Sequence, residues 1–154
     1  MSEGGGSVPP VTDETMARIG AAMAQGPDDA RRLLAEIWDD DGADALHRVA
    51  VAHYLADLQG DPHDELAWDR RALAEADAVT DDRVDAAGVA APVRAFYPSL
   101  HLNLGESLRK VGDLAAARDQ LARGRASVDA LPDDGYGRLI RTSLDDLAAR
   151  LGES

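Results

Sequence analysis

The chain has 154 residues, of which 16 are Lys or Arg and 29 are Asp or Glu, so its formal net charge is -13. This charge argues against nucleic acid and against an anionic membrane surface as partners, because both are bound through basic side chains. The absence of cysteine excludes disulfides, thiolate metal sites and a cysteine nucleophile. The length predicts one domain, and we expect a cytoplasmic protein because the sequence shows neither a secretory signal nor a membrane-spanning apolar run.

The N-terminal residues 1–11 differ in composition from the rest of the chain. They contain a run of glycines and a pair of prolines, and they have no apolar periodicity. We therefore expect a disordered leader over 1–11 and a single domain over 12–152. In that domain the good helix formers Ala and Leu are frequent, whereas aromatic residues make up 4% of the chain. This composition predicts an all-α fold.

Two helices are predicted directly after the leader. Met16, Ile19 and Met23 recur every three or four residues, which is the period of one helical face. Thr12 is a suitable N-cap for this first helix. Pro27 suits the first turn of the second helix, whose apolar face ends before an aspartate-rich run.

The two helices predicted next differ in the distribution of their apolar residues. Residues 43–58 place apolar side chains at nearly every angle of a helical wheel, which predicts a helix between neighbours and the most buried element. Asp61 and Pro62 open the following helix, which runs to about Val79. Asp69 intrudes on the apolar face of that helix.

The C-terminal half is predicted to contain one short helix and three longer ones. Thr80 caps the short helix within residues 80–97, where glycine and prolines interrupt regular structure. Gly112 separates the next two helices, and Pro132 precedes the last. The apolar face of the last helix comprises Tyr136, Ile140, Leu144, Leu147 and Leu151. In total the sequence predicts seven main helices, one short helix and no strand.

Residues 98–131 carry a distinctive spacing of large and small side chains. The residues that define it are Leu104, Gly105, Leu108, Gly112, Asp113, Ala117, Leu121 and Gly124. Small residues at Gly105, Ala117 and Gly124 would let two antiparallel helices approach closely. A second Gly-Asp turn, at residues 60–61, lies 52 residues before the turn at 112–113.

This spacing resembles one repeat of the tetratricopeptide-repeat (TPR) family, whose unit of about 34 residues pairs two antiparallel helices. Residues 46–79 resemble a degenerate copy, in which Glu65 and Asp69 fall on core positions of the second helix. Residues 80–97 match an insert between the two units. The resemblance implies antiparallel helix-turn-helix pairs stacked as a short right-handed solenoid, with residues 136–151 as a C-terminal capping helix.

The resemblance also implies that the first helix of each pair lines a concave face that binds peptides or proteins. The candidate partner-binding residues at these positions are Asn103, Glu106, Arg109, Lys110, His47 and Tyr54. Asn103, Arg109 and Lys110 are suited to hold a carboxylate, although Arg109 and Lys110 are equally compatible with ordinary solvated side chains. The carboxylate-clamp pattern of the family is not reproduced, because Leu102 and Glu106 stand at its Lys and Asn positions.

The sequence predicts no metal, no cofactor and no catalysis. His47 and His53 lie six residues apart, so on one straight helix their rings point about 120° apart and cannot share an ion. His53 and Asp57 do share a face, but they do not complete a ligand set. Phosphate-binding glycine loops and a nucleophile elbow are also absent from the sequence.

These observations lead to two hypotheses of function. The first is a non-enzymatic TPR-like adaptor that binds a protein or peptide segment on its concave face, with basic residues in the partner. The alternative is a regulatory small-molecule-binding module, in which Trp68, Tyr54 and the histidines line a pocket. Because many of the aspartates fall at or just before predicted helix starts, much of the negative charge is interpreted as helix capping.

Overall fold

A computed structural model describes residues 13–89 and 91–152. The predicted leader over 1–11 lies outside these residues. The N-cap of the first helix is Asp13 and not Thr12, because the Asp13 carboxylate accepts the Met16 N–H. The described residues form eight α-helices and two short 3-10 helices, and they contain no strand. Their bounds are α1 Glu14–Met23, α2 Pro27–Trp38, α3 Ala45–Asp57, α4 Pro62–Ala76, α5 Asp81–Ala86, η1 Val93–Phe96, α6 Tyr97–Lys110, α7 Leu114–Ala126, η2 Val128–Ala130 and α8 Gly135–Arg150.

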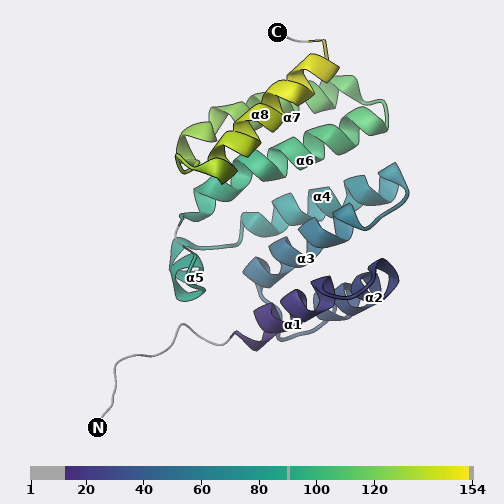
Figure 1. The fold of residues 1–154 in the computed structure, drawn as a ribbon, viewed down its shortest axis with the longest axis vertical. Helices are drawn as coiled ribbons and strands as arrows, with labels where there is room; N and C mark the ends of the chain where they lie inside the picture. Colours follow the sequence, from purple (N-terminus) through teal and green to yellow (C-terminus); the bar gives the residue numbers. More distant parts are fainter. Residues whose placement is uncertain (1–12, 90, 153–154) are drawn as a thin grey trace.

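The longer helices pack as successive pairs. Contacts join α1 to α2, α3 to α4 and α6 to α7, and α8 packs against both α6 and α7. The pairs follow one another along the longest axis of the molecule, with α5 beside the stack (Figure 1). Neighbouring pairs meet where α2 contacts α3 and where α4 contacts α6. Within the described residues, the predicted all-α fold with seven main helices and one short helix is confirmed.

Side-chain caps begin most of these helices. The aspartates whose carboxylates accept a backbone N–H from the first turn are Asp13, Asp44, Asp61, Asp113 and Asp134. Thr80 caps α5 in the same way, as predicted. Each cap contributes about 1 kcal/mol to stability, so these residues define where the helices begin. The turn between α6 and α7 contains Gly112, whose φ of 89° favours glycine.

The interior is filled by apolar side chains that the helical periodicities predict. Helix α3 is buried against α2 and α4, as expected for residues 43–58. Helix α4 ends at Ala76, slightly before the predicted end. On the predicted face of α8, four side chains are buried but Tyr136, in the first turn, is 49% exposed.

Candidate functional site

An apolar groove of about 250 Å³ lies between α3 and the N-terminal part of α6. Its lining comes from α1, α3, the segment after α5, η1, α6 and the first turn of α8. The lining residues are Met16, Leu46, Val49, Ala50, His53, Tyr54, Val89, Phe96, Ser99, Leu100 and Tyr136. We call this surface the apolar groove. Several of these side chains are only partly buried, so a ligand seated here would remove further apolar surface from water.

The position of Tyr136 in the groove depends on a tight turn before α8. The carboxylate of Asp134 accepts the backbone N–H of Gly137 at 2.9 Å. A Cβ added at Gly137 would lie 1.9 Å from the carbonyl oxygen of Pro132. Only glycine therefore fits between the Pro132 backbone and the start of α8, and this close approach sets where Tyr136 projects.

A polar recess of about 220 Å³ lies beside the apolar groove, between α6 and α8. Its lining residues are Leu102, Asn103, Glu106, Ser143, Asp146 and Arg150. Ser99 of the groove and Asn103 and Glu106 of the recess follow at helical spacing along one face of α6. The two surfaces are thus neighbours on the same helix.

Three of the predicted partner-binding residues, Tyr54, Asn103 and Glu106, lie on these surfaces. Tyr54 lines the apolar groove, and its ring lies 5.5 Å from that of His53. Asn103 lines the polar recess, and its Nδ2 donates to Nδ1 of His53 at 3.1 Å. This bond joins α6 to α3 between the groove and the recess.

Glu106 and two more predicted residues, Arg109 and Lys110, are held in ion pairs. Arg109 Nη2 lies 2.5 Å from Oε1 of Glu106, whose other oxygen lies 2.9 Å from Nη1 of Arg150. Lys110 Nζ lies 3.1 Å from Oε1 of Glu65. A carboxylate from a partner would therefore have to compete with Glu106 and Glu65 for these cations.

His47, the sixth predicted residue, is only 5% exposed. Its backbone N–H donates to Asp44, and the Asp44 N–H donates to its Nδ1, so His47 completes the cap of α3. Because Nδ1 accepts this bond, the ring proton resides on Nε2, which donates to Asp13 at 2.8 Å. The structure thus places His47 in the buried cap of α3, and it lines neither the apolar groove nor the polar recess.

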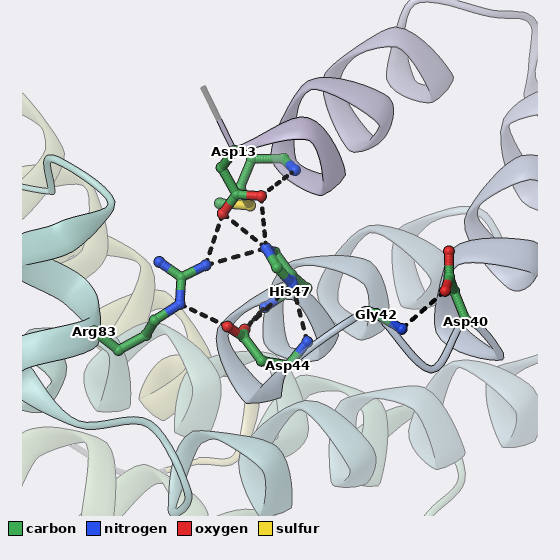
Figure 2. A network of polar contacts seen from close by, with 7 residues as sticks. Asp13, Asp40, Gly42, Asp44, His47 and Arg83 are labelled. Carbon is green, nitrogen blue, oxygen red and sulfur yellow. Dashed lines mark hydrogen bonds and ion pairs between the residues drawn. The ribbon is translucent and has the colours of Figure 1, made fainter. Parts of the chain in front are cut away.

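A polar network around His47 connects three segments that are distant in sequence (Figure 2). Arg83 of α5 donates from Nη2 to Asp13 at 2.7 Å and from Nε to Asp44 at 2.6 Å. Asp13 and Asp44 are the N-caps of α1 and α3. We call Asp13, Asp44, His47 and Arg83 the capping network.

The capping network is strongly coupled electrostatically. Partial burial raises the pKa of Asp13, but hydrogen bonds from His47 and Arg83 outweigh it and bring the pKa down to about 2. Burial also raises the pKa of Asp44, and the bonds from Arg83 and the His47 N–H leave it lowered overall. The bond to Asp44 in turn raises the pKa of Arg83. Each charge in the network thus stabilises the others.

The capping network positions one wall of the apolar groove. Met16 lies one turn after Asp13, and Leu46 directly precedes His47. The Val89 N–H donates to the carbonyl of Val84 at 3.2 Å, which ties the segment after α5 to that helix. Fixing the starts of α1 and α3 against α5 therefore fixes the wall formed by Met16, Leu46 and Val89.

Several residues that shape this site were not predicted from the sequence. Phe96 and Val89 fall in the stretch that interrupts the repeat pattern, where no periodicity indicates which way a side chain points. Arg83 lies 39 residues from Asp44 and 70 from Asp13 in sequence, and no local pattern predicts that they meet. The only signal was that Asp13 and Asp44 stood at helix starts.

The aromatic residues of the alternative hypothesis do not form one pocket. Tyr54 and His53 line the apolar groove. Trp68 instead packs edge-on against Trp38 with ring centroids 5.1 Å apart, and the guanidinium of Arg71 lies 4.3 Å from its ring. Trp68 therefore belongs to the contact between α2 and α4.

No protein-family model, curated protein or solved structure matches the chain. Within residues 13–89 and 91–152, no group of three or more His, Cys, Asp or Glu side chains is placed to hold a metal ion. None of the helices in this part of the chain has the length and apolar character needed to cross a membrane.

Proposed function

We propose that the protein is a non-enzymatic, TPR-like interaction module that binds a segment of a partner protein along the apolar groove and the polar recess. The observation that carries this proposal is which helices line the groove. The α-helices among them are α1, α3 and α6, the first helix of each pair, and the following helix α8, and Val89 and Phe96 of the segment between α5 and α6 complete the lining. These correspond to the helices that line the concave face in TPR proteins, so the proposal includes a short right-handed solenoid.

The dimensions of the apolar groove favour a peptide anchor over a whole metabolite. Its volume of about 250 Å³ is below the roughly 300–1,000 Å³ typical of small-molecule sites. A single large apolar side chain of a partner would fill the groove, while the flanking backbone would run along α6 past Asn103. Asp146 in the neighbouring recess is exposed and suits a basic residue of that partner.

Site-specific photo-crosslinking tests the proposed function. A photoreactive phenylalanine analogue replaces Tyr136, which projects into the groove, and in a control variant it replaces Leu114, which is 42% exposed on α7 outside the groove. In cells of the native host, the analogue at Tyr136 should capture a discrete protein, identified by mass spectrometry. Equal capture at Leu114, or capture at neither position, would contradict the proposal.

Charge placed in the groove should then weaken the captured complex. Tyr54→Glu introduces a carboxylate among apolar lining residues, and Leu114→Glu is the matched control on an exposed site. We expect Tyr54→Glu to weaken binding at least tenfold, while circular dichroism shows both variants folded. Arg109→Glu combined with Asn103→Ala changes Asn103 of the recess and removes the ion pair between Arg109 and Glu106. Unchanged binding of this variant in the same assay would restrict the interface to the groove.

A second candidate function is the binding of a small apolar molecule in the same groove. The observation in its favour is that His53 and Tyr54 offer polar groups beside an otherwise apolar lining. A thermal-shift screen of metabolites should then give a ligand that raises the melting temperature of the wild type but not of Tyr54→Glu. A blank screen together with a crosslinked protein partner would exclude this alternative.

A further inference from the structure

A buried carboxyl group lies between two helix pairs. Asp69 is on α4 and is 4% exposed. It accepts a hydrogen bond from the hydroxyl of Ser107, which is fully buried on α6. Helices α4 and α6 form the main contact between the α3–α4 pair and the α6–α7 pair. We call this contact the seam.

The charged groups around Asp69 do not neutralise it. Helix α3 contributes Asp57 and α4 itself contributes Glu65, and both carboxylates raise the pKa of Asp69. Helix α6 contributes Lys110, whose ammonium group forms its ion pair with Glu65 at 3.1 Å. Asp69 therefore has a hydroxyl group as its hydrogen-bond partner, in surroundings that are negative on balance.

Burial is the largest influence on this carboxyl group. Desolvation raises the pKa of Asp69, the Ser107 hydrogen bond and Lys110 oppose the rise, and Glu65 and Asp57 add to it, which leaves the pKa at about 7. The protonated and charged forms are thus both present near neutral pH. A neutral carboxyl group satisfies the Ser107 hydroxyl without placing an unpaired charge in the seam.

We propose that Asp69 is a protonation switch in the seam: the neutral carboxyl group holds the α3–α4 and α6–α7 pairs together, and the loss of its proton loosens them. A carboxyl group whose pKa is higher in the folded than in the unfolded state favours folding when it is protonated. Its contribution is present in full below the unfolded value of 3.8 and is lost as the pH rises through about 7.

The switch also has a consequence for the proposed binding site. Ser107 in the seam and Ser99 and Asn103 at the groove and the recess are all carried by α6. A looser seam would let α6 move relative to α3 and would change the distance across the apolar groove. This consequence for binding rests on the proposed function, whereas the switch itself does not.

Urea unfolding at several pH values tests the switch. In the wild type the unfolding equilibrium constant should rise by up to about tenfold per pH unit between pH 5 and pH 7 and then level off. Asp69→Asn keeps an acceptor for Ser107 but cannot ionise, so its unfolding constant should lose this rise. Asp85→Asn, at an exposed carboxylate on α5, should behave as the wild type. The same pH profile in the wild type and in Asp69→Asn would overturn the proposal.

If Asp69→Asn does not fold, a direct titration of Asp69 in the wild-type protein tests the proposal. The carboxyl carbon of Asp69 in the wild-type protein, followed by NMR, should titrate with a midpoint near neutral pH. A midpoint near the ordinary value of about 4 would overturn the proposal. Hydrogen exchange, corrected for its intrinsic pH dependence, should show protection falling in α4 and α6 more than in α1 and α2 above pH 7. A uniform fall would place the effect outside the seam.

Neither experiment uses a binding partner, so the switch and the proposed function can fail separately. If the crosslinking experiment identifies no partner but Asp69 titrates near neutral pH, the proposed switch is supported and the proposed binding site is rejected. If a partner is captured but Asp69 titrates near pH 4, the reverse holds. If both succeed, binding to wild type should change between pH 6 and pH 8 and binding to Asp69→Asn should not.

Discussion

Helix α8 and the α6–α7 pair meet at glycines, whereas the starts of α1 and α3 and the short helix α5 meet at charged side chains. A Cβ added at Gly105 would lie 2.9 Å from Leu147, and one added at Gly124 would lie 3.0 Å from Leu144. In the capping network the contacts are instead those of Arg83 with Asp13 and Asp44. The same chain thus joins neighbouring elements in two physically different ways.

The difference predicts how each region responds to its surroundings. The C-terminal region depends on shape, because apolar contact is lost whenever a side chain or a charge enters it. Salt and acid should affect it less, because in the ion pair between Glu106 and Arg150 at this contact the Arg150 side chain is exposed. The capping network depends on charge, so it should weaken when ions screen it or when its carboxylates are protonated. Substitutions in each region test this difference.

The largest effect should come from a charge in the core of the C-terminal region. Leu121 is 1% exposed, and Leu121→Asp would bury a carboxylate without a cation. This should cost at least about 4 kcal/mol and unfold the domain, as measured by circular dichroism and thermal melting. Leu114→Asp, on the exposed side of the same helix, should change stability by less than about 0.5 kcal/mol. An intact melt for Leu121→Asp would show that the interior is not close-packed there.

A smaller but still large effect should come from one added methyl group. At Gly137 a Cβ would lie 1.9 Å from the carbonyl oxygen of Pro132, so Gly137→Ala forces the backbone to move and should cost about 3 kcal/mol. At Gly135, in the same first turn, the nearest atom to a Cβ is Nη2 of Arg138 at 3.9 Å. Gly135→Ala should therefore be close to neutral in urea unfolding. Equal stabilities of the two variants would show that the turn before α8 has room to adjust.

The two regions also differ in how far the sequence predicts them. In the C-terminal region, large and small residues follow local helical periods, so the pairing of α6 with α7 and the closeness at Gly105 were predictable. At the capping network the aspartates could be placed at helix starts. Their meeting with Arg83 could not, because it depends on how three helix starts come together in space. Likewise Asp69 was recognised as an intruder on an apolar face, but its bond to Ser107 required the structure.

The next largest effect should come from removing Arg83, the cation that the carboxylates of Asp13 and Asp44 share in the capping network. Arg83→Ala leaves Asp13 and Asp44 facing each other without it, and we expect a loss of about 2 kcal/mol at low salt. In 1 M NaCl the difference from the wild type should shrink, because salt screens the interaction. Arg32→Ala removes exposed pairs with Asp29 and Glu36 and should cost at most about 0.5 kcal/mol. A loss for Arg83→Ala that does not depend on salt would mean that packing by its side chain dominates.

The smallest effect should come from removing the charge of Asp13 alone from the capping network. Asp13→Asn keeps the helix cap, since Asn also accepts the Met16 N–H, but it removes the charge that His47 and Arg83 stabilise. The folded pKa of Asp13, about 2, lies below its ordinary value of 3.8, so its contribution is present above pH 4 and is lost as the pH falls toward 2. Asp13→Asn should therefore be less stable than the wild type by about 1 to 2 kcal/mol at pH 7, and the two should converge near pH 2. A difference that persisted at pH 2 would show that the amide disturbs the geometry of the network and not only its charge.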